Sequence, residues 1–297
     1  MKEITFEEVR EICLDIMQDV HEFCVDNNIR YSLGCGSLIG AIRHKGYIPW
    51  DDDIDILMPR PDYDRFCDTY SSSKGYVCMS YPKHEYWSAY AKVCDNSKTF
   101  VHSPSPIGKE NIGVWIDVLP IDGAEDNNEL FSKHANEALY RFNRLLRLRS
   151  FKKLKNSNLI IKMGYYIVSV LKGLNINKET EEFINCCKRI PFGTTQHVAI
   201  YTTPLLGAPR HHQYKAFTEY ILVPFEDKSF YVMKGYDHYL TNIYGNYMKL
   251  PPENKRVRVH YVHKYYWKKP NEKIPKDTYT MHNLKDSIMY TLCKFFN

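Results

Sequence analysis

An acidic run that leads into an apolar strand is the feature of this sequence that most directly suggests chemistry. The segment GYIPWDDDIDILM (46–58) places four carboxylates within five positions. Because side chains alternate along a strand, Asp51, Asp53 and Asp55 are expected to share one face, whereas Asp52 points away and is structural. Carboxylates gathered on one face repel each other unless a cation joins them, and carboxylate oxygens suit Mg²⁺ or Mn²⁺. The run therefore predicts a divalent metal site.

Two other interpretations of the acidic run were considered. An EF-hand calcium loop also begins with alternating Asp, but it requires Gly at its sixth position and Glu at its twelfth. Those positions hold Ile56 and Asp62 here, so a calcium loop is excluded. A solvated acidic loop followed by an ordinary strand stays open as the alternative.

Two flanking segments strengthen the metal interpretation. Upstream, LGCGSL (33–38) is a Gly-Ser turn that leads into a helix, where backbone N–H groups can hold a phosphate, and Gly36 and Ser37 are the candidates. Downstream, Asp117 is a lone acid in the apolar strand VWIDVL, and a buried carboxylate needs a partner such as a shared metal. This order of turn, Asp-x-Asp strand and later single Asp is typical of nucleotidyltransferase-like sites.

The elements that position these residues can be predicted from periodicity. Thr5 and Glu8 form a capping-box pattern at the start of an amphipathic helix that extends to about residue 27. Pro61 is expected in the first turn of another helix, and Pro120 is expected to end the strand that carries Asp117. The further expected helices cover 37–44 and 61–73, and the expected strands cover 30–33, 53–58, 76–81, 87–94 and 114–119. Strands and helices do not alternate strictly, which favours the α+β class.

The chain divides into three expected parts. Residues 1–127 form the catalytic core, 128–180 a basic helical region, and 181–297 a mixed part that completes the donor and acceptor site. Residues 139–172 hold nine Lys and Arg and no acid. Because these nine positive charges exceed the net charge of +5, the rest of the chain is net negative. This distribution argues against a general nucleic-acid binder. The stretch is either a solvated helix face or a peripheral contact with anionic membrane.

Cysteine usage and the N-terminal sequence bear on the compartment. The nine Cys are scattered without a CxxC pair, which argues against a disulfide framework or a zinc site. The start of the sequence is acidic and amphipathic, unlike a signal peptide. We expect a cytoplasmic protein that could lie on the inner face of the cell membrane.

Several motifs resemble one family. The segment LIGAIRHKGYIPWDDDIDILMPRPDYDRF (38–66) resembles the LicD family, which is similar in its core to nucleotidyltransferases and related to fukutin-type proteins. Four more segments match in the family's order: AKVCDNSKT, VWIDVLPIDG, PFED and YGNYMKLPPENKR. Asn246 departs from the pattern, because the family usually has Asp there.

The resemblance implies a nucleotidyltransferase-like core, with a small mixed sheet flanked by helices, and a phosphotransferase activity. The expected reaction transfers phosphocholine from CDP-choline to a hydroxyl of a cell-surface glycan, such as teichoic acid or lipopolysaccharide, and releases CMP. Two metal ions would neutralise the transferring group. Asp53 and Asp55 are the expected catalytic metal ligands, and Asp117 is the third ligand and general base. Asp51 is either a further ligand or a loop acid.

The donor site is expected to involve residues from several motifs. Arg43, His44 and Lys45 could neutralise the diphosphate or simply end a solvated helix, and Trp50 could face choline or belong to the core. Tyr47 and Trp87 are weaker candidates for the choline pocket. Four further binding positions follow from the resemblance alone, namely Glu226, Tyr244, Arg256 and His260. The expected binding residues are Gly36, Ser37, Arg43, His44, Lys45, Trp50, Lys92, Glu226, Tyr244, Arg256 and His260.

Other activities stay open at this point. The donor could carry ribitol, glycerol or ethanolamine phosphate in place of phosphocholine. The same three Asp would also serve a true nucleotidyltransferase that attacks the α-phosphorus and releases pyrophosphate. A glycosyltransferase is disfavoured because its Asp-x-Asp normally follows a full nucleotide-binding βαβ half. A non-catalytic glycan-binding module would have no need for the three Asp together.

Overall fold

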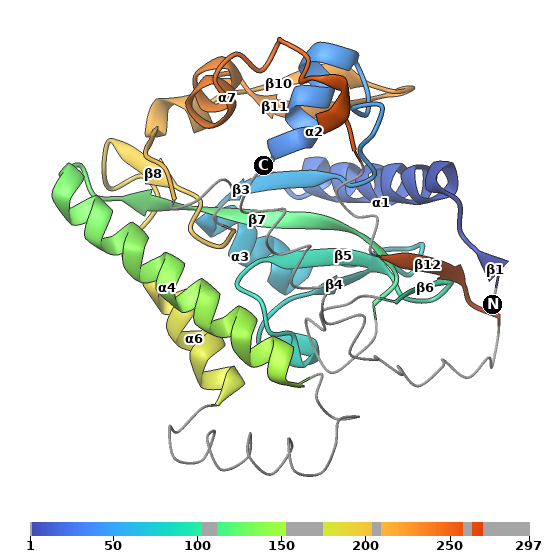
Figure 1. The fold of residues 1–297 in the computed structure, drawn as a ribbon, viewed down its shortest axis with the longest axis horizontal. Coiled ribbons are helices and arrows are strands. Elements are labelled where there is room, and N and C mark those ends of the chain that lie inside the picture. The colour runs from blue at the N-terminus through green and yellow to red at the C-terminus, as the bar shows by residue number, and fades with distance from the viewer. Residues whose placement is uncertain (1, 103–111, 153–174, 204–208, 258–262, 270–297) are drawn as a thin grey trace.

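A mixed sheet forms the centre of the protein (Figure 1). The computed structural model describes residues 2–102, 112–152, 175–203, 209–257 and 263–269. The central strands lie in the order β2 (Ser32–Leu33), β3 (Asp55–Pro59), β7 (Val114–Ala124), β5 (Ala91–Asp95) and β4 (Val77–Met79). β3 and β7 are parallel, and the other neighbours in this order are antiparallel. This mixed pairing confirms the predicted α+β class.

Short strands extend this sheet or form small sheets beside it. β8 (His197–Ala199) pairs with the end of β7 and with β9 (His212–Gln213). A hairpin of β10 (Tyr220–Phe225) and β11 (Lys228–Met233) contacts β2, and β12 (Lys264–Trp267) pairs with β1 (Lys2–Glu3) and β6 (Thr99–His102). Strands from the C-terminal third therefore pair with the core. The expected boundaries at 127 and 180 stay a prediction.

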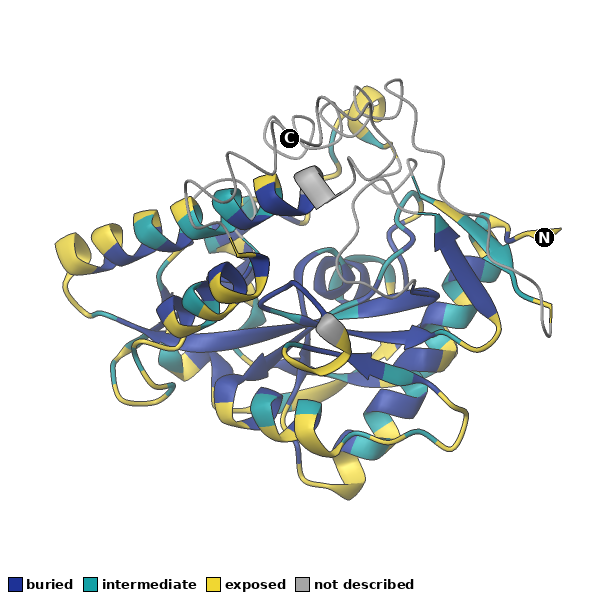
Figure 2. Cartoon of the chain, turned by 90° about the horizontal axis from the view of Figure 1, so that it is seen from below, coloured by how far each residue is buried: buried dark blue, intermediate teal, exposed yellow. Residues whose placement is uncertain are grey.

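The first helix, α1 (Phe6–Asp26), begins at the predicted capping box. The Thr5 hydroxyl accepts the Glu8 N–H at 3.2 Å, and the Glu8 carboxylate accepts the Thr5 N–H at 2.8 Å. The buried face of α1 includes Ile16 and Val20 and packs on β7 and β5. The other helices within the described residues are α2 (Cys35–Ile39), α3 (Arg60–Thr69), α4 (Asn128–Lys152), α6 (Ile176–Cys187) and α7 (Tyr236–Tyr244), with a π-helical turn at Gly40–His44 and 3₁₀ turns at Lys83–Glu85, Tyr214–Phe217 and Glu253–Lys255. Figure 2 shows the strands buried between helices whose outer faces are exposed.

The predicted end of a strand at Pro120 is wrong. β7 continues through Pro120 to Ala124, and Pro120 stands opposite Met58 of β3. The other edge of β7 pairs with β5 only as far as Val118, and β8 pairs only from Asp122. Proline is tolerated in a strand where its missing N–H would face an unpaired edge.

A buried ion pair joins the start of α3 to β7. Arg60 donates to both carboxylate oxygens of Asp122, from Nε at 2.6 Å and from a terminal nitrogen at 2.7 Å. Both residues are buried, at 7% and 0% exposure. Arg60 also lies over the ring of Tyr63. This bidentate geometry fixes α3 against the strand that carries Asp117.

The described part of the basic stretch packs against α6. Arg141 pairs with Glu182 at 3.0 Å and Arg144 with Glu179 at 2.6 Å, while Arg149 is buried. Arg141 and Arg144 therefore hold α4 on α6, and these three arginines do not form a positive surface. The stretch beyond Lys152 lies outside the described residues, so the membrane contact stays a prediction.

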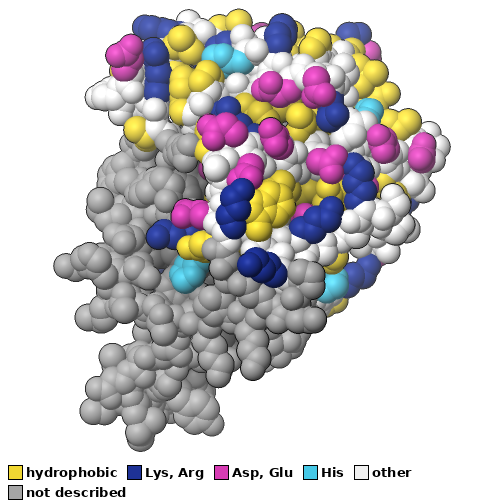
Figure 3. Space-filling view, turned by 90° about the vertical axis from the view of Figure 1, so that its right-hand side faces the viewer, with side chains coloured by type: hydrophobic (Ala, Val, Ile, Leu, Met, Phe, Trp, Pro, Cys, Tyr) yellow, Lys and Arg dark blue, Asp and Glu magenta, His cyan; other side chains and the backbone are white. Residues whose placement is uncertain are grey.

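The described surface carries charges of both signs. On the face shown in Figure 3, acidic and basic side chains are mixed around small apolar areas. This face therefore has no single-sign stripe of the kind that nucleic-acid binders show. No described helix combines the length and apolar character that crossing a membrane requires.

Candidate active site

Three predicted residues form a row across the central sheet. Asp55 of β3 stands opposite Asp117 of β7, and Asp117 stands opposite Lys92 of β5. Residues in register on neighbouring strands point to the same face, so the row places two carboxylates and one ammonium side by side. The structure therefore brings Asp117 to the acidic strand, 62 positions away in the sequence.

Lys92 and Asp117 form an ion pair within this row. Lys92 is 4% exposed, and its ammonium lies 4.2 Å from the ring centroid of Trp115. Burial alone would lower the pKa of Lys92, but the Asp117 carboxylate outweighs it and raises the pKa. A carboxylate has two oxygens, so Asp117 can bind Lys92 with one and offer the other to a second cation.

The carboxylates of Asp51, Asp52 and Asp53 gather before β3. One oxygen from each lies within 4.8 Å of the other two. Asp52 therefore faces the cluster, contrary to the expectation that it points away. The regular strand begins only at Asp55, so strict alternation does not apply to the preceding residues.

The electrostatics of this cluster fit a hard divalent cation. Burial, together with the neighbouring carboxylates of Asp53 and Asp55, raises the pKa of Asp51 well above its usual range. The nearby thiol of Cys13 is not a competing soft ligand, because burial raises its pKa and its Sγ donates to the Trp115 carbonyl at 3.3 Å. Among the described residues the cluster thus offers carboxylate oxygens, which is the donor set of Mg²⁺ and Mn²⁺ sites.

Arg10 of α1 holds the loop that carries these carboxylates. Its guanidinium donates to the carbonyl oxygens of Asp51 at 2.8 Å and Ile48 at 2.7 Å. It is stacked between the rings of Phe6 and Tyr47, at 4.3 and 4.9 Å from their centroids. Arg10 is not among the residues predicted from the sequence. Its one signal is that Arg10 lies one helical turn after Phe6 and so can stack on that ring.

Arg10→Ala is expected to weaken Mn²⁺ binding and turnover by about 10- to 100-fold, the usual effect of removing an outer-shell partner of a metal site. Mn²⁺ affinity would be measured by titration calorimetry and turnover under saturating donor. Arg10→Lys should recover little, because one ammonium cannot reproduce a planar two-carbonyl clamp. Arg65→Ala on α3 is the matched control. Wild-type Mn²⁺ affinity in Arg10→Ala would contradict the assigned role.

Glu226 supports the same loop from the opposite side. It lies at the tip of the β10–β11 hairpin with a positive φ of 54°, and its carboxylate accepts the Tyr47 N–H at 2.8 Å. Its own N–H donates to the Lys45 carbonyl, also at 2.8 Å. Between these bonds Gly46 has no space for a side chain, because a Cβ would lie 2.2 Å from the Glu226 carboxylate. Glu226, which was expected to bind the donor, therefore stabilises the loop at residues 45–47 through these bonds.

The Gly-Ser turn lies directly beside the carboxylates. A Cβ on Gly36 would approach the Asp51 carboxylate to 2.7 Å, so a side chain at this position would have to displace that carboxylate. The Ser37 hydroxyl accepts the Asp55 N–H at 2.9 Å, which ties the turn to the first residue of β3. Ser37 keeps its own proton for donation. A phosphate role for this turn stays a prediction.

The three expected cations at residues 43–45 make bonds within the chain. Arg43 donates to the Tyr247 carbonyl at 2.5 Å and to His44 Nε2 at 2.9 Å. Lys45 ends the π-helical turn with a positive φ of 61°, and its ammonium donates to the Ile42 carbonyl. In this arrangement Arg43 holds the loop after α7 beside the site.

The end of α7 and the loop after it hold two further predicted residues, Tyr244 and Arg256. The Arg256 guanidinium lies 5.7 Å from the Trp50 ring centroid, so Trp50 already faces a cation. Burial raises the pKa of Tyr244, and so do Cys35 and the carboxylates of Asp55, Asp51 and Asp53. His260 lies outside the described residues.

The weaker choline candidates are in the core. Tyr47 is buried, and its hydroxyl donates to the Arg10 carbonyl at 2.8 Å. Trp87 is buried in a separate cluster against α4 and α6. Among the aromatic candidates, Trp50 is therefore the one half-buried at the edge of the carboxylate loop.

Comparisons with known proteins agree with this arrangement. Residues 28–156 match the family described as LicD/FKTN/FKRP, nucleotidyltransferase domain. The Haemophilus influenzae protein named lipopolysaccharide cholinephosphotransferase LicD is 30% identical over 277 residues, which are 90% of this chain and 99% of that protein. An uncharacterized protein of Rickettsia prowazekii is 54% identical over 47 residues, and one of Rickettsia typhi is 49% identical over 47 residues. These two matches cover 16% of this chain and 18% and 15% of the Rickettsia proteins, respectively. The chain therefore belongs to the LicD family and is a transferase of that family.

Proposed function

We propose that the chain transfers phosphocholine from CDP-choline to a hydroxyl of a cell-surface glycan and releases CMP. The proposal rests most on one observation, the similarity that spans 99% of a protein named as a lipopolysaccharide cholinephosphotransferase. The carboxylates of the 51–55 loop, joined in register to Asp117, support it because phosphoryl transfer needs a clustered metal site.

The proposed step balances as a single displacement. The acceptor hydroxyl oxygen forms a bond to the phosphorus that carries choline, while the bond from that phosphorus to the bridging oxygen breaks. CMP leaves with the bridging oxygen, and the hydroxyl proton moves to a carboxylate, for which Asp117 is the candidate. The choline phosphate stays intact and becomes a phosphodiester of the glycan.

The residues of this chain would divide the work between holding ions and holding the donor. Asp51, Asp53, Asp55 and the second oxygen of Asp117 would hold one or two Mg²⁺ or Mn²⁺ ions. Bound ions supply neutralisation of the charge on the transferring phosphoryl group. Lys92 keeps the Asp117 carboxylate oriented on the sheet, and it can also attract the diphosphate.

The C-terminal part is proposed to complete the donor site. Gly36 would let backbone approach the phosphates, with Arg43 of the π-helical turn and Arg256 of the loop after α7 on either side of them. Trp50 would offer its ring to the trimethylammonium group, because an aromatic face that already attracts a guanidinium can attract another cation.

A donor screen tests the proposal. With Mg²⁺ and lipopolysaccharide or teichoic acid as acceptor, CDP-choline is expected to give the highest kcat/KM for CMP release among CDP-choline, CDP-ribitol, CDP-glycerol and CDP-ethanolamine. EDTA should abolish release. Preference for another of the four donors would replace phosphocholine by that alcohol phosphate. Pyrophosphate formation from CTP and phosphocholine, without CMP release from any CDP-alcohol, would overturn the proposal in favour of a nucleotidyltransferase.

A further inference from the structure

A polar groove lies beside α7, apart from the carboxylate cluster. Its volume is about 540 Å³, within the range of small-ligand sites. The groove is bordered by β8, β9, the residue before β9 and α7. Its lining side chains are His197, His211, Gln213, Asp237, His238, Thr241 and Asn242.

A stack of three rings forms one wall of the groove. The His211 ring is stacked on Phe131, with centroids 3.8 Å apart, and on His197, with centroids 4.3 Å apart. His197 is the outer ring of this stack, and its side chain is 32% exposed. Burial lowers the pKa of His211, which favours a neutral ring. The stack thus presents a rigid, flat ring of the kind on which the C–H face of a sugar can pack.

Hydrogen bonds behind the groove fix the orientation of its polar groups. His197 Nδ1 bonds the Asp126 carboxylate at 2.8 Å, and His211 Nε2 donates to the Glu125 carbonyl at 2.6 Å. Asn242 Nδ2 donates to the His211 carbonyl at 2.6 Å, and one Asp237 oxygen accepts the Tyr247 hydroxyl. Each of these side chains keeps a second polar atom, so the groove offers imidazole nitrogens, an amide oxygen and a carboxylate oxygen together.

The composition of the lining argues against other ligand classes. It holds one carboxylate and no Lys or Arg, so it does not suit a phosphate. Stacked imidazoles point their nitrogens side by side rather than toward one point, and among the described residues only the 51–53 cluster brings three potential metal ligands together. Acceptor atoms beside a flat ring instead match a carbohydrate, whose hydroxyls can donate to them and whose C–H face can pack on the ring.

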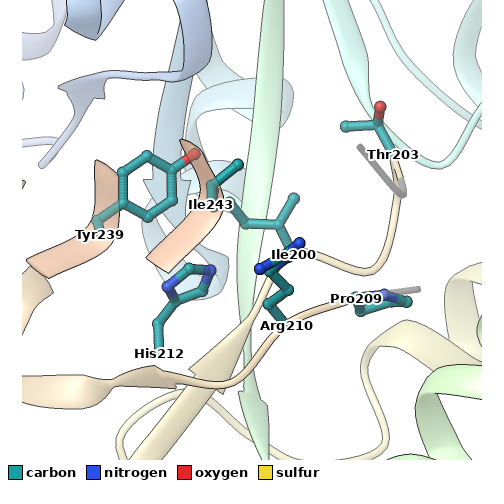
Figure 4. A pocket seen from close by; sticks show the side chains of 7 residues that line it. All are labelled: Ile200, Thr203, Pro209, Arg210, His212, Tyr239 and Ile243. Carbon is teal, nitrogen blue, oxygen red and sulfur yellow. The ribbon is translucent and has the colours of Figure 1, made fainter. Parts of the chain in front are cut away.

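The small cavity next to the groove cannot hold a substrate. It measures about 20 Å³ and is lined by Tyr239 and Ile243 of α7 together with Arg210 and His212 (Figure 4). That volume accommodates about one water molecule. Arg210 donates to the Asn242 carbonyl at 2.6 Å and so supports the groove from behind.

One helix connects the groove with the carboxylate cluster. Asp237, Thr241 and Tyr244 are spaced i, i+4 and i+7 and therefore share a face of α7. At about 1.5 Å per residue, Asp237 lies about 10 Å along the helix axis from Tyr244. α7 also packs on α2, where the Tyr239 hydroxyl lies 3.8 Å from Cys35 Sγ, and the next residue, Gly36, borders the Asp51 carboxylate. The helix that lines the groove therefore also packs beside the reaction centre.

We propose that this groove binds the glycan part of the acceptor, at a subsite remote from the hydroxyl that receives the phosphoryl group. The inference rests on the proposed function for the identity of the glycan as acceptor. The binding of sugar itself rests only on the groove, so it can be tested without turnover.

Saturation-transfer NMR with methyl glycosides of glucose, galactose and N-acetylgalactosamine provides that test. The wild-type chain is expected to transfer saturation to at least one of the three, with millimolar affinity. His197→Ala and Gln213→Ala should each weaken binding by about three- to tenfold, the usual effect of losing one hydrogen-bonding group. Gln18→Ala on the exposed side of α1 is the matched control and should bind as the wild type does.

Each outcome decides between the two proposals. No saturation transfer to any of the three sugars, or equal transfer in the wild type and both groove variants, overturns the glycan groove. Sugar binding that the groove variants weaken supports it, even if the donor screen shows no CMP release and the proposed reaction fails. If the reaction occurs, the same two variants should also raise KM for the glycan acceptor more than they lower kcat.

Discussion

Asp53→Asn is expected to lower kcat by about 10³-fold or more while leaving the free energy of unfolding nearly unchanged. A metal ion stabilises the transferring charge by several kcal/mol, which corresponds to about three powers of ten in rate. Asn keeps the shape of Asp but is a weaker metal ligand, and it removes one repelling charge from the cluster with Asp51 and Asp52. CMP release, Mn²⁺ titration and urea unfolding would measure the three effects.

Asp53→Asn is a cleaner test than the same change at Asp117. Lys92 is buried and paired with Asp117, so Asp117→Asn would leave a buried ammonium without its carboxylate. Asp68→Asn, at an exposed position of α3, is the matched control and should retain full activity. Turnover by Asp53→Asn within tenfold of wild type would refute its role as a metal ligand.

Asp122→Ala is expected to destabilise the fold by about 3–5 kcal/mol, because it strands the buried Arg60 guanidinium. Urea unfolding should show a lower midpoint with little change in slope. Asp64→Ala is the matched control. It removes the other, half-exposed partner of Arg60, at 3.6 Å, and should cost less than about 1 kcal/mol.

A double replacement separates loss of charge pairing from loss of packing. Arg60→Met combined with Asp122→Leu should recover most of the stability, since apolar residues often replace a buried pair without loss. A loss below 1 kcal/mol in Asp122→Ala would show that the pair does not stabilise the junction of α3 and β7.

Local signals in the sequence predicted much of the fold and the centre of the site. The capping box at Thr5 and Glu8 set the start of α1, and the lone acid in an apolar strand identified Asp117 as a partner for the acidic run. These features could be recognised because each depends on residues close in sequence or on the cost of burying a charge.

Features that depend on distant contacts could not be predicted. Pro120 can continue β7 because the edge of β7 away from β3 is unpaired at that position. Asp52 faces the carboxylate cluster because the regular part of β3 begins only at Asp55. The side chains of Arg10 and Glu226 bond to backbone atoms of the loop. Because any residue type supplies these backbone atoms, the loop sequence contains no pattern that predicts the two bonds. Side chain to backbone bonds across many positions are the part of the site that spacing alone does not reveal.

The two supports of the carboxylate loop have a consequence for synthesis of the chain. Arg10 leaves the ribosome before the loop, whereas Glu226 follows the bonded Tyr47 by 179 positions. The loop can reach its final geometry only after the β10–β11 hairpin has been translated, so metal binding is expected late in biogenesis. A fragment cut at residues 28 and 156, the matched family segment, would contain every predicted carboxylate ligand but neither support. The smallest catalytic unit is therefore larger than the segment by which the family is recognised.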